Sequence, residues 1–455
     1  MTSSSVLVQL GQCGTQLGHN LLDTIYQDAV ECPLGFSASQ NERYHRISTE
    51  TYFKELKTGF HEARAVTVDM EPKVVNQAIE SARRSGKWTY PAGMQLCRKS
   101  GSGNNWSYGF QIHGSRCENE VLSLLRKEAE KCDRLSGFIV VMSLAGGTGS
   151  GLGSYVVQLI KDNFPHSVIL NPIVMPYKAG EVAVQNYNAV LTLSCVLTHA
   201  DASVLLHNDH LHNVCSKSLN IDKVSINHLN TVAAHQLASV LQPADSLSNN
   251  SLLELPYKRQ DILFDIVRST SCHSQYKILT LRSVPHLADR SIAFSTFNWP
   301  SLLKRMKQMH LTNFFVDEGM DWQVRLEKSM PSYTKQHSKS LGNMLFLRGE
   351  GAGKLTENDF QEFFDSRLYA LWVPSDEQCH IWSTQRRFRQ YEKSVSMLSN
   401  NSFCTEGLDT VINKAWNMFT AKAYLHQYTK YGLEEEDFLN AFVKVENVIN
   451  SYRKL

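Results

Sequence analysis

The sequence predicts an α/β protein whose N-terminal domain is built on a parallel sheet flanked by helices. Over the first two hundred residues, short apolar runs alternate with longer amphipathic runs, which is typical of strands and helices in such a sheet. From Val224 to Leu241 the apolar positions recur at helical spacing, and they predict one long, largely buried helix. The middle third predicts a mixed α+β domain, and residues 408–452 are helical in pattern almost throughout.

The individual elements follow from the same patterns. Continuous apolarity predicts buried strands at residues 6–10, 65–68, 138–142 and 168–174. Helical spacing predicts helices at residues 15–26, 118–131 and 152–161. Residues 244–260 are rich in Ser, Asn and Asp and predict a loop, while the acidic run from Glu434 to Asp437 is typical of a helix start. We expect three regions along the chain: 1–223, 224–400 and 401–455.

Composition excludes several classes of partner. The chain has 46 Lys and Arg against 44 Asp and Glu in 455 residues, so no global charge recruits nucleic acid or an anionic membrane surface. No stretch approaches the roughly 20 apolar residues that cross a bilayer. We therefore expect a cytoplasmic protein with no nucleic-acid partner and no membrane insertion.

Cysteine spacing favours reduced thiols. The ten cysteines include no C-x-x-C pair, so neither a disulfide framework nor a paired zinc site is indicated. His207, His210, His212 and Cys215 form the densest group of possible zinc ligands. On a helix, however, His212 points away from the face that His207 and His210 share, and we interpret the group as a polar helix surface.

The strongest chemical signal is a glycine-rich run between a predicted buried strand and a predicted helix. Its residues are Ala145, Gly146, Gly147, Thr148, Gly149, Ser150 and Gly151. Glycines allow successive N–H groups to turn towards one anion, and the following helix adds its positive N-terminal end. The run is no Walker loop and, with Ser154 at the third position, no dinucleotide fingerprint. Ordinary turn chemistry is the alternative interpretation.

Two further small-residue loops support a phosphate site. Gly11-Gln12-Cys13-Gly14 also joins a predicted strand to a predicted helix, and Gly101-Ser102-Gly103-Asn104-Asn105 offers amide donors. Asp69 and Glu71 follow another strand and are suitable ligands for Mg²⁺, directly or through water. Their alternative role is that of a helix N-cap and a first-turn acid.

Six segments together resemble the tubulin superfamily in order and spacing. They are GQCGTQLG at 11–18, VDMEP at 68–72, GNNW at 103–106, AGGTGSGLG at 145–153, YNAVLT at 187–192 and AYLHQYT at 423–429. The resemblance covers nearly the whole chain. It implies a GTP-binding N-terminal domain, a long central helix, an intermediate domain and a C-terminal helical layer, with GTP or GDP and Mg²⁺ as ligands.

The resemblance also implies roles for individual residues. Gln12 and Cys13 would meet phosphates and ribose, the two asparagines at 104 and 105 the γ-phosphate end, and Glu181 the ribose. Asn208 and Asn227 would read the guanine edge, since an amide both donates and accepts. The set assigned to GTP is Gly11, Gln12, Cys13, Gln16, Asn104, Asn105, Ser143, Ala145, Gly146, Gly147, Thr148, Gly149, Ser150, Gly151, Glu181, Asn208 and Asn227.

Several departures set this chain apart from α- and β-tubulins. Lys223 stands where these stack a tyrosine on the base, and Gln185 replaces a second acid near the ribose. The interface loop lacks the Asn-x-Asp pattern, and the last residues, Tyr452 to Leu455, carry no acidic tail. These features resemble the delta class. The resemblance implies a role in centrioles, basal bodies and cilia, with other tubulins and centriolar proteins as partners.

Hydrolysis is expected to depend on assembly. Asp261 and Asp265 are the acids nearest to the altered interface loop, so either would act on the nucleotide of a neighbouring tubulin. The alternative is that both solvate the start of a helix at 262–268. Two other functions stay open: a free-standing GTPase, and a nucleating or regulatory nucleotide-binding protein of the γ-tubulin type.

Overall fold

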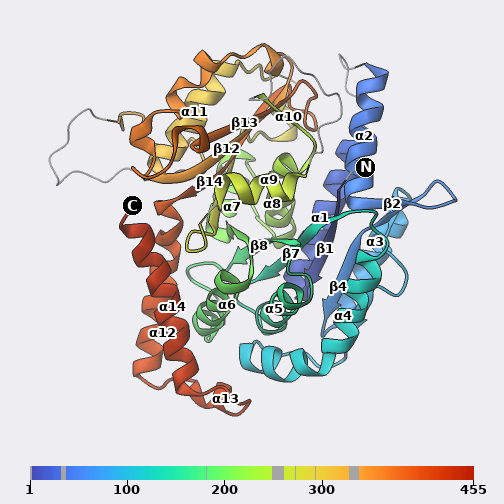
Figure 1. The fold of residues 1–455 in the computed structure, drawn as a ribbon, viewed down its shortest axis with the longest axis vertical. Helices are drawn as coiled ribbons and strands as arrows, with labels where there is room; N and C mark the ends of the chain where they lie inside the picture. Colours follow the sequence, from blue (N-terminus) through green and yellow to red (C-terminus); the bar gives the residue numbers. More distant parts are fainter. Residues whose placement is uncertain are drawn as a thin grey trace.

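The computed structural model describes residues 3–31, 37–180, 182–247, 261–271, 273–292, 294–326 and 338–455. Within these ranges the chain builds one large sheet with helices on both faces, and a pair of C-terminal helices lies along one side of the molecule (Figure 1). The prediction of an α/β fold with a helical C-terminal region is confirmed.

The parallel part of the sheet surrounds β1 (Ser4–Leu10). This strand pairs with β4 (Ala65–Asp69) on one side and β7 (Leu135–Ser143) on the other. The parallel order extends through β6 (Gln95–Cys97) at one edge and through β8 (Val168–Met175), β9 (Ala202–His207) and β11 (Ile278–Val284) in the other direction. Because these strands run in one direction, their carboxyl ends meet at the same edge of the sheet.

Strand β11 also begins a mixed part of the sheet, in which one of the four strand pairings between described residues is parallel and the other three are antiparallel. It pairs with β14 (Lys393–Asn401), and the order continues through β12 (Ser340–Gly349), β13 (Cys379–Thr384) and β10 (Asp245–Ser246). A separate small sheet contains β2 (Phe53–Glu55), β3 (His61–Ala63) and β5 (Trp88–Thr89). Backbone pairing is therefore continuous between the N-terminal and middle thirds, and the division at 223 and 400 stays a prediction.

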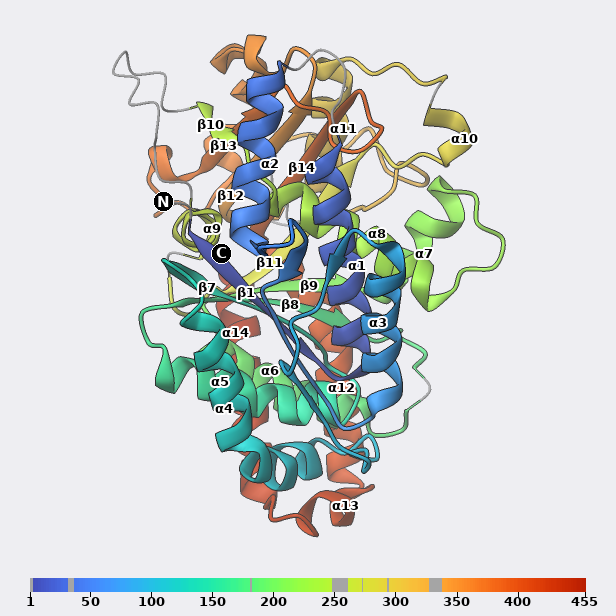
Figure 2. The same cartoon turned by 90° about the vertical axis from the view of Figure 1, so that its right-hand side faces the viewer.

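Helices cover both faces of the parallel strands (Figure 2). One face carries α1 (Gly11–Val30), α3 (Pro72–Ser85) and α8 (Ile226–Leu241). The other carries α4 (Ser115–Ala129), α5 (Gly153–Asn163) and α6 (Gln185–His199). The C-terminal helices α12 (Glu406–Thr420) and α14 (Glu435–Arg453) pack outside α6, with the short α13 (Leu425–Thr429) between them. The acidic run at 434–437 caps α14, as the sequence predicts.

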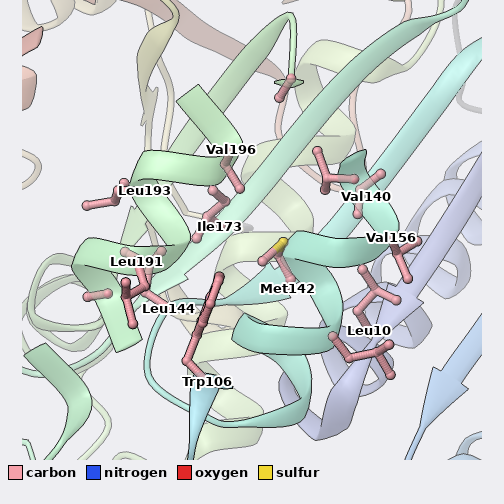
Figure 3. Packing of buried hydrophobic residues seen from close by; sticks show 14 of the residues in the cluster. Leu10, Trp106, Val140, Met142, Leu144, Val156, Ile173, Leu191, Leu193 and Val196 are labelled. Carbon is pink, nitrogen blue, oxygen red and sulfur yellow. The ribbon is translucent and has the colours of Figure 1, made fainter. Parts of the chain in front are cut away.

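Strand β7 contributes to two cores because successive side chains of a strand face opposite sides. Ile139 and Val141 belong to the core that includes residues of α1 and α8. Val140 and Met142 belong to the core with α5 and α6, where Trp106 also packs (Figure 3). This two-sided burial explains the continuous apolarity of the strand.

The remaining helices lie around this framework. They are α2 (Ala38–Tyr52), α7 (Asn208–Asn213), α9 (Ile262–Thr270), α10 (Asp289–Ile292) and α11 (Trp299–Thr312). Single π-helical turns occur at Tyr108–Gly114, Thr148–Leu152 and Val214–Ser218. Short 3₁₀ segments occur at Ala352–Lys354, Glu357–Phe363, Ser366–Leu368, Ser375–Glu377 and Ser402–Thr405. None of the helices in the described ranges has both the length and the apolarity of a bilayer-spanning helix.

Two helices begin earlier than the sequence pattern predicts. Helix α1 starts at Gly11, whose φ of 68° lets the chain turn from β1 into the helix without a linker. The helical turns after β7 start at Thr148, so part of the glycine-rich run is itself a helix N-terminus. Most of the predicted loop at 244–260 lies outside the described residues.

A buried ion pair joins the N-terminal helices to the segment that follows β13. The Arg386 guanidinium donates to Asp28 Oδ1 at 3.0 Å, and both side chains are almost inaccessible. Tyr44 and Gln242 donate to the other carboxylate oxygen at 2.6 and 2.9 Å. Arg386 also lies over the Tyr44 ring, 4.0 Å from its centroid. Removing the carboxylate would therefore leave a buried, unpaired cation.

We expect Asp28→Ala to lower the free energy of unfolding by about 3–5 kcal/mol, because removing one partner of a buried ion pair leaves the other charge buried and unpaired. Urea denaturation followed by circular dichroism measures the change. Glu80→Ala is the control, since the Glu80–Arg84 pair is exposed and contributes less than about 1 kcal/mol. Equal losses in the two variants would contradict a structural role for the buried pair.

Candidate nucleotide-binding site

A cavity of about 740 Å³ opens where β1, β4, β7, β8 and β9 end. The residues assigned from the sequence that line it are Gln12, Cys13, Gln16, Asp69, Glu71, Asn104, Ser143, Ala145, Gly146, Gly147, Thr148, Gly149 and Asn208. The structure therefore gathers segments that are far apart in sequence around one space. Cavities at the carboxyl ends of parallel strands are the usual ligand sites of such sheets.

The glycine-rich run forms one end of this cavity. Gly147 precedes the turn Thr148–Leu152, which continues into α5, so unpaired N–H groups of a helix start lie beside the cavity. A Cβ on Gly147 would lie 2.7 Å from the Asn105 nitrogen, whereas a Cβ on Gly146 would have only Ser143 Oγ near it, at 3.9 Å. Close packing therefore requires a glycine at 147 but leaves space at 146.

The last two residues of the run do not line the cavity. The Ser150 hydroxyl donates to the Gly146 carbonyl oxygen, and a Cβ on Gly151 would collide with the Trp106 carbonyl oxygen. Both residues belong to the helical turn and pack against its neighbours. The sequence assigned them to GTP because glycine and serine suit both phosphate loops and tight helix packing.

The loop at 101–105 lies against the glycine-rich run. Ser102 Oγ and Thr148 Oγ1 are 2.9 Å apart, and Asn104 adopts a φ of 54° at the cavity. The Asn105 side chain is engaged elsewhere, since its Oδ1 accepts from the Tyr108 N–H at 2.9 Å and its Nδ2 donates to the Gln427 carbonyl at 3.0 Å. Asn104 is thus the member of the predicted pair that lines the cavity.

The start of α1 supplies a third side. Gly11 lies beneath the cavity lining, and its Cβ would approach the Gly149 nitrogen to 2.8 Å, so the two loops are in close contact there. Gln12, Cys13 and Gln16 follow on the side of the first turns that faces the cavity. Burial raises the pKa of the Cys13 thiol to about 12, so this cysteine is a neutral group rather than a nucleophile.

Asp69 and Glu71 bring negative charge to the same end. Asp69 is buried, and burial raises its pKa to about 6 against the opposing effect of N–H donors from Met70 and Glu71. Its Oδ2 has no hydrogen-bond partner. Glu71 precedes α3 but makes no side-chain capping bond, so the alternative role as a helix cap is not realised by its carboxylate.

This donor set fits a hard divalent cation. No lysine or arginine is found among the described residues that line the cavity. Asp69 and Glu71 therefore face the part of the cavity that would hold phosphates, and a cation would offset their charge, while a third carboxylate, Asp209, lines the cavity beside Asn208. The described ranges contain no cluster of three or more His, Cys, Asp or Glu side chains placed to hold a metal. A bound Mg²⁺ would accordingly need phosphate oxygens in addition to Asp69 and Glu71.

The opposite end of the cavity carries two amides and apolar side chains. Asn208 begins α7, while Ile226, Leu229 and Asn230 come from the start of α8. Asn227 is exposed, and its Oδ1 accepts a hydrogen bond from Asn20 at 3.3 Å instead of facing the cavity. Asn230, one helical turn later, is buried at the cavity and was missed from the sequence.

A sequence signal for Asn230 does exist. It is a polar residue within the apolar face that contains Leu229, Val232 and Ala233, where the helical period predicts core. Lys223, which stands at the position expected for a stacking ring, does not line the cavity, whereas Ile226 does. Gln185 also lines the cavity, and Glu181 lies outside the described residues.

The histidine group forms no metal site in the structure. His210 stacks on Phe315 with ring centroids 4.0 Å apart, whereas His212 Nδ1 lies 3.2 Å from the Tyr177 hydroxyl. Burial lowers the pKa of His210 to about 3 and that of His207 to about 4. These two rings are therefore neutral at physiological pH and pack as polar core groups.

Asp261 and Asp265 lie at the other end of the sheet. Asp261 caps α9 by accepting from the Phe264 N–H at 3.3 Å, and it also accepts from the Ser136 hydroxyl and pairs with Arg134. Ser136 is near the beginning of β7, whereas Ser143 at its end lines the cavity. Neither aspartate can therefore reach the cavity of its own chain. Asp265 lies in the first turn of α9.

Comparison with known proteins identifies relatives over the whole length. Residues 4–216 match the model of the Tubulin/FtsZ family, GTPase domain. Tubulin delta chains of Canis lupus familiaris and Homo sapiens are 44% and 42% identical to this chain, each over 99% of it and 100% of the relative. A tubulin beta-2 chain of Emericella nidulans is 28% identical over 99% of this chain and 94% of its own length. The predicted resemblance to the delta class is confirmed.

The two neighbouring glycines of the cavity wall give a direct test of its packing. We expect Gly147→Ala to destabilise the protein by about 1–3 kcal/mol, because the added methyl overlaps the backbone at Asn105. Gly146→Ala should stay within about 0.5 kcal/mol of wild type. Urea denaturation of the nucleotide-free protein measures both. A Gly146 variant as unstable as the Gly147 variant would contradict this arrangement of the loops.

Proposed function

Because this chain belongs to the tubulin superfamily of GTP-binding cytoskeletal proteins, we propose that it binds GTP or GDP in the cavity at 145–149 and works through contacts with other tubulins. The observation that carries the proposal is that the two ends of this cavity offer different chemical groups. One end offers glycine-rich loops and a helix start for phosphates. The other offers amide side chains that suit a base.

At the phosphate end, the backbone N–H groups of Ala145 to Gly149 would hold the phosphate chain together with the start of α1. Gln12 and Asn104 would add side-chain donors. Asp69 and Glu71 would hold Mg²⁺, whose charge would compensate phosphate oxygens, since the described part of the lining contains no lysine or arginine. In this arrangement the protein positions the phosphates chiefly through its backbone.

At the base end, Asn208 and Asn230 would read the guanine edge, because each amide can donate to a carbonyl oxygen and accept from an N–H group. Ile226 would pack against the base as an aliphatic surface in place of a stacked ring. Gln185 would face the ribose with its neutral amide. We retain Glu181 as a ribose contact from the resemblance alone.

The position of α9 at the opposite end of the sheet from the cavity supports the proposed assembly with other tubulins. Its first turn lies near the amino ends of the strands, so Asp265 would approach the nucleotide of a neighbour rather than its own. Asp261 and Asp265 are the two carboxylates of this helix start that could position water at a neighbour's nucleotide, and Asp261 also caps α9 and pairs with Arg134. The likeness to delta chains supports a role at centrioles, basal bodies and cilia, with centriolar proteins and α-, β- or divergent tubulins as partners.

Guanine selectivity tests the base end. We expect Asn230→Ala to weaken GTP binding about tenfold while leaving weak ATP binding unchanged, because a buried amide contact to the base is lost. Competition against a fluorescent GTP analogue measures both affinities. Asn227→Ala is the matched control one turn away on the same helix, and it should bind like wild type. Equal affinity of the wild type for ATP and GTP would refute the base assignment.

Hydrolysis tests the assembly proposal. We expect the isolated protein to hydrolyse GTP very slowly and a partner tubulin to accelerate the reaction, with Asp265→Ala reducing the accelerated rate about 100-fold. Single-turnover assays with labelled GTP loaded on each protein in turn identify whose nucleotide is cleaved. Asp261→Ala should act mainly through stability, since this residue caps α9. Fast hydrolysis by the lone protein would instead identify a free-standing GTPase.

A further inference from the structure

A buried asparagine on α6 joins two loops of the cavity. Asn188 is fully buried, and its Nδ2 donates to the carbonyl oxygens of Asn104 and Ala145, each at 2.8 Å. The Gly146 carbonyl lies within 3.4 Å of the same nitrogen. One amide group therefore bridges the 101–105 loop and the glycine-rich run from behind.

The oxygen of the same amide also has two hydrogen-bond partners. Asn188 Oδ1 accepts from the Trp106 N–H at 3.1 Å and from the Tyr428 hydroxyl at 2.6 Å. Donor and acceptor sides are both satisfied, and exchanging them would place NH₂ against an N–H and oxygen against two carbonyls. Burial raises the pKa of Tyr428, so its hydroxyl stays protonated and can donate. The Trp106 N–H and the two carbonyls thus set the orientation of the Asn188 amide, and the Tyr428 hydroxyl holds it in place from α13.

Tyr428 belongs to α13, which makes further contacts with the same loop region. Asn105 Nδ2 donates to the Gln427 carbonyl at 3.0 Å, and the Ser107 hydroxyl donates to the Tyr428 carbonyl at 3.2 Å. The rings of Tyr108 and Tyr431 meet edge to face with centroids 4.8 Å apart. The C-terminal helices therefore contact the cavity loops through a continuous, buried hydrogen-bond network rather than through a single bond.

The positions of these loops would determine how well the cavity binds phosphates. No described lining residue is a lysine or arginine, so backbone N–H groups must be aimed at the phosphates by the loops themselves. We propose that Asn188 is a positioning residue for the phosphate-binding loops and that Tyr428 couples it to α13. Nucleotide occupancy and the packing of the C-terminal helices then depend on each other, because coupling between two sites is reciprocal. The inference rests on the proposed nucleotide site.

The experiment compares two single-hydroxyl deletions. Tyr428→Phe removes the bond to Asn188, whereas Tyr187→Phe removes a bond to the Ala423 carbonyl at 3.1 Å in the same interface but away from the cavity loops. Competition assays give affinities for GTP, GDP and guanosine. We expect Tyr428→Phe to weaken GTP and GDP about tenfold and guanosine less than about twofold, since only the phosphates meet these loops. Tyr187→Phe should affect all three less than about twofold.

A second variant separates the contribution of the Asn188 NH₂ group from that of its oxygen. Asn188→Asp keeps the acceptor for Tyr428 and Trp106 but turns a carboxylate oxygen towards the carbonyls of Asn104 and Ala145, so we expect a loss of GTP affinity above about 100-fold. Hydrogen exchange of residues 425–431 supplies the reciprocal readout. GTP should slow exchange there in the wild type and in Tyr187→Phe, and have little effect in Tyr428→Phe.

The outcomes distinguish this inference from the proposed function. If the wild type binds GTP but Tyr428→Phe behaves like Tyr187→Phe, or weakens guanosine as much as GTP, the positioning role is overturned while the nucleotide site stands. If the folded wild type binds no guanine nucleotide, the proposed site is overturned and the coupling with it.

Discussion

In the proposed function, the cavity would hold an anion with no lysine or arginine among its described lining residues. Those residues include three carboxylates, Asp69, Glu71 and Asp209. Phosphate charge must then be met by backbone N–H groups, by helix starts and by a bound cation. A lysine can adjust its reach by rotating its side chain, but a backbone amide is aimed only by the loop that carries it. Loop placement is therefore the constraint on which the site depends.

The parallel sheet meets this constraint by fixing where each loop begins. The strands β1, β4 and β7 pair in register, so the residues that follow them start at neighbouring points on one edge. Close approach then needs glycine at specific places. A Cβ at Gly11 would meet the Gly149 backbone, and one at Gly14 would collide with the Val141 carbonyl oxygen. Packing on both faces of β7 holds this edge against movement.

The same directionality separates the two halves of the proposed chemistry. The cavity lies at the carboxyl ends of the strands, while the cap of α9 contacts Ser136 near the opposite ends. If the chain assembles as proposed, a protomer would meet its neighbours through two different surfaces, which is the head-to-tail type of contact that leads to open assemblies. The buried network through Asn188 connects the cavity loops to the C-terminal helices.

The sequence alone determined the fold class, the order of strands and helices, and the segments that supply the cavity. These follow from apolar periodicity and from glycine-rich turns at strand ends, which are local properties of the chain. Asp69 and the run from Ala145 to Gly149 lie at the cavity as those patterns predict, and Asn208 lies there as the resemblance to tubulins implies.

Tertiary structure decided which member of each similar set faces the cavity. Asn230 faces it and Asn227 does not, because the rotation of α8 is set by its packing on α1 and the sheet rather than by the spacing of its asparagines. The Asn105 side chain is held away from the cavity by hydrogen bonds to Tyr108 and α13. Asp261 is held at the start of α9 as a helix cap. Side chains of one chemical type are interchangeable in a sequence pattern, and only long-range contacts, such as the bond between Tyr428 and Asn188, distinguish them in space.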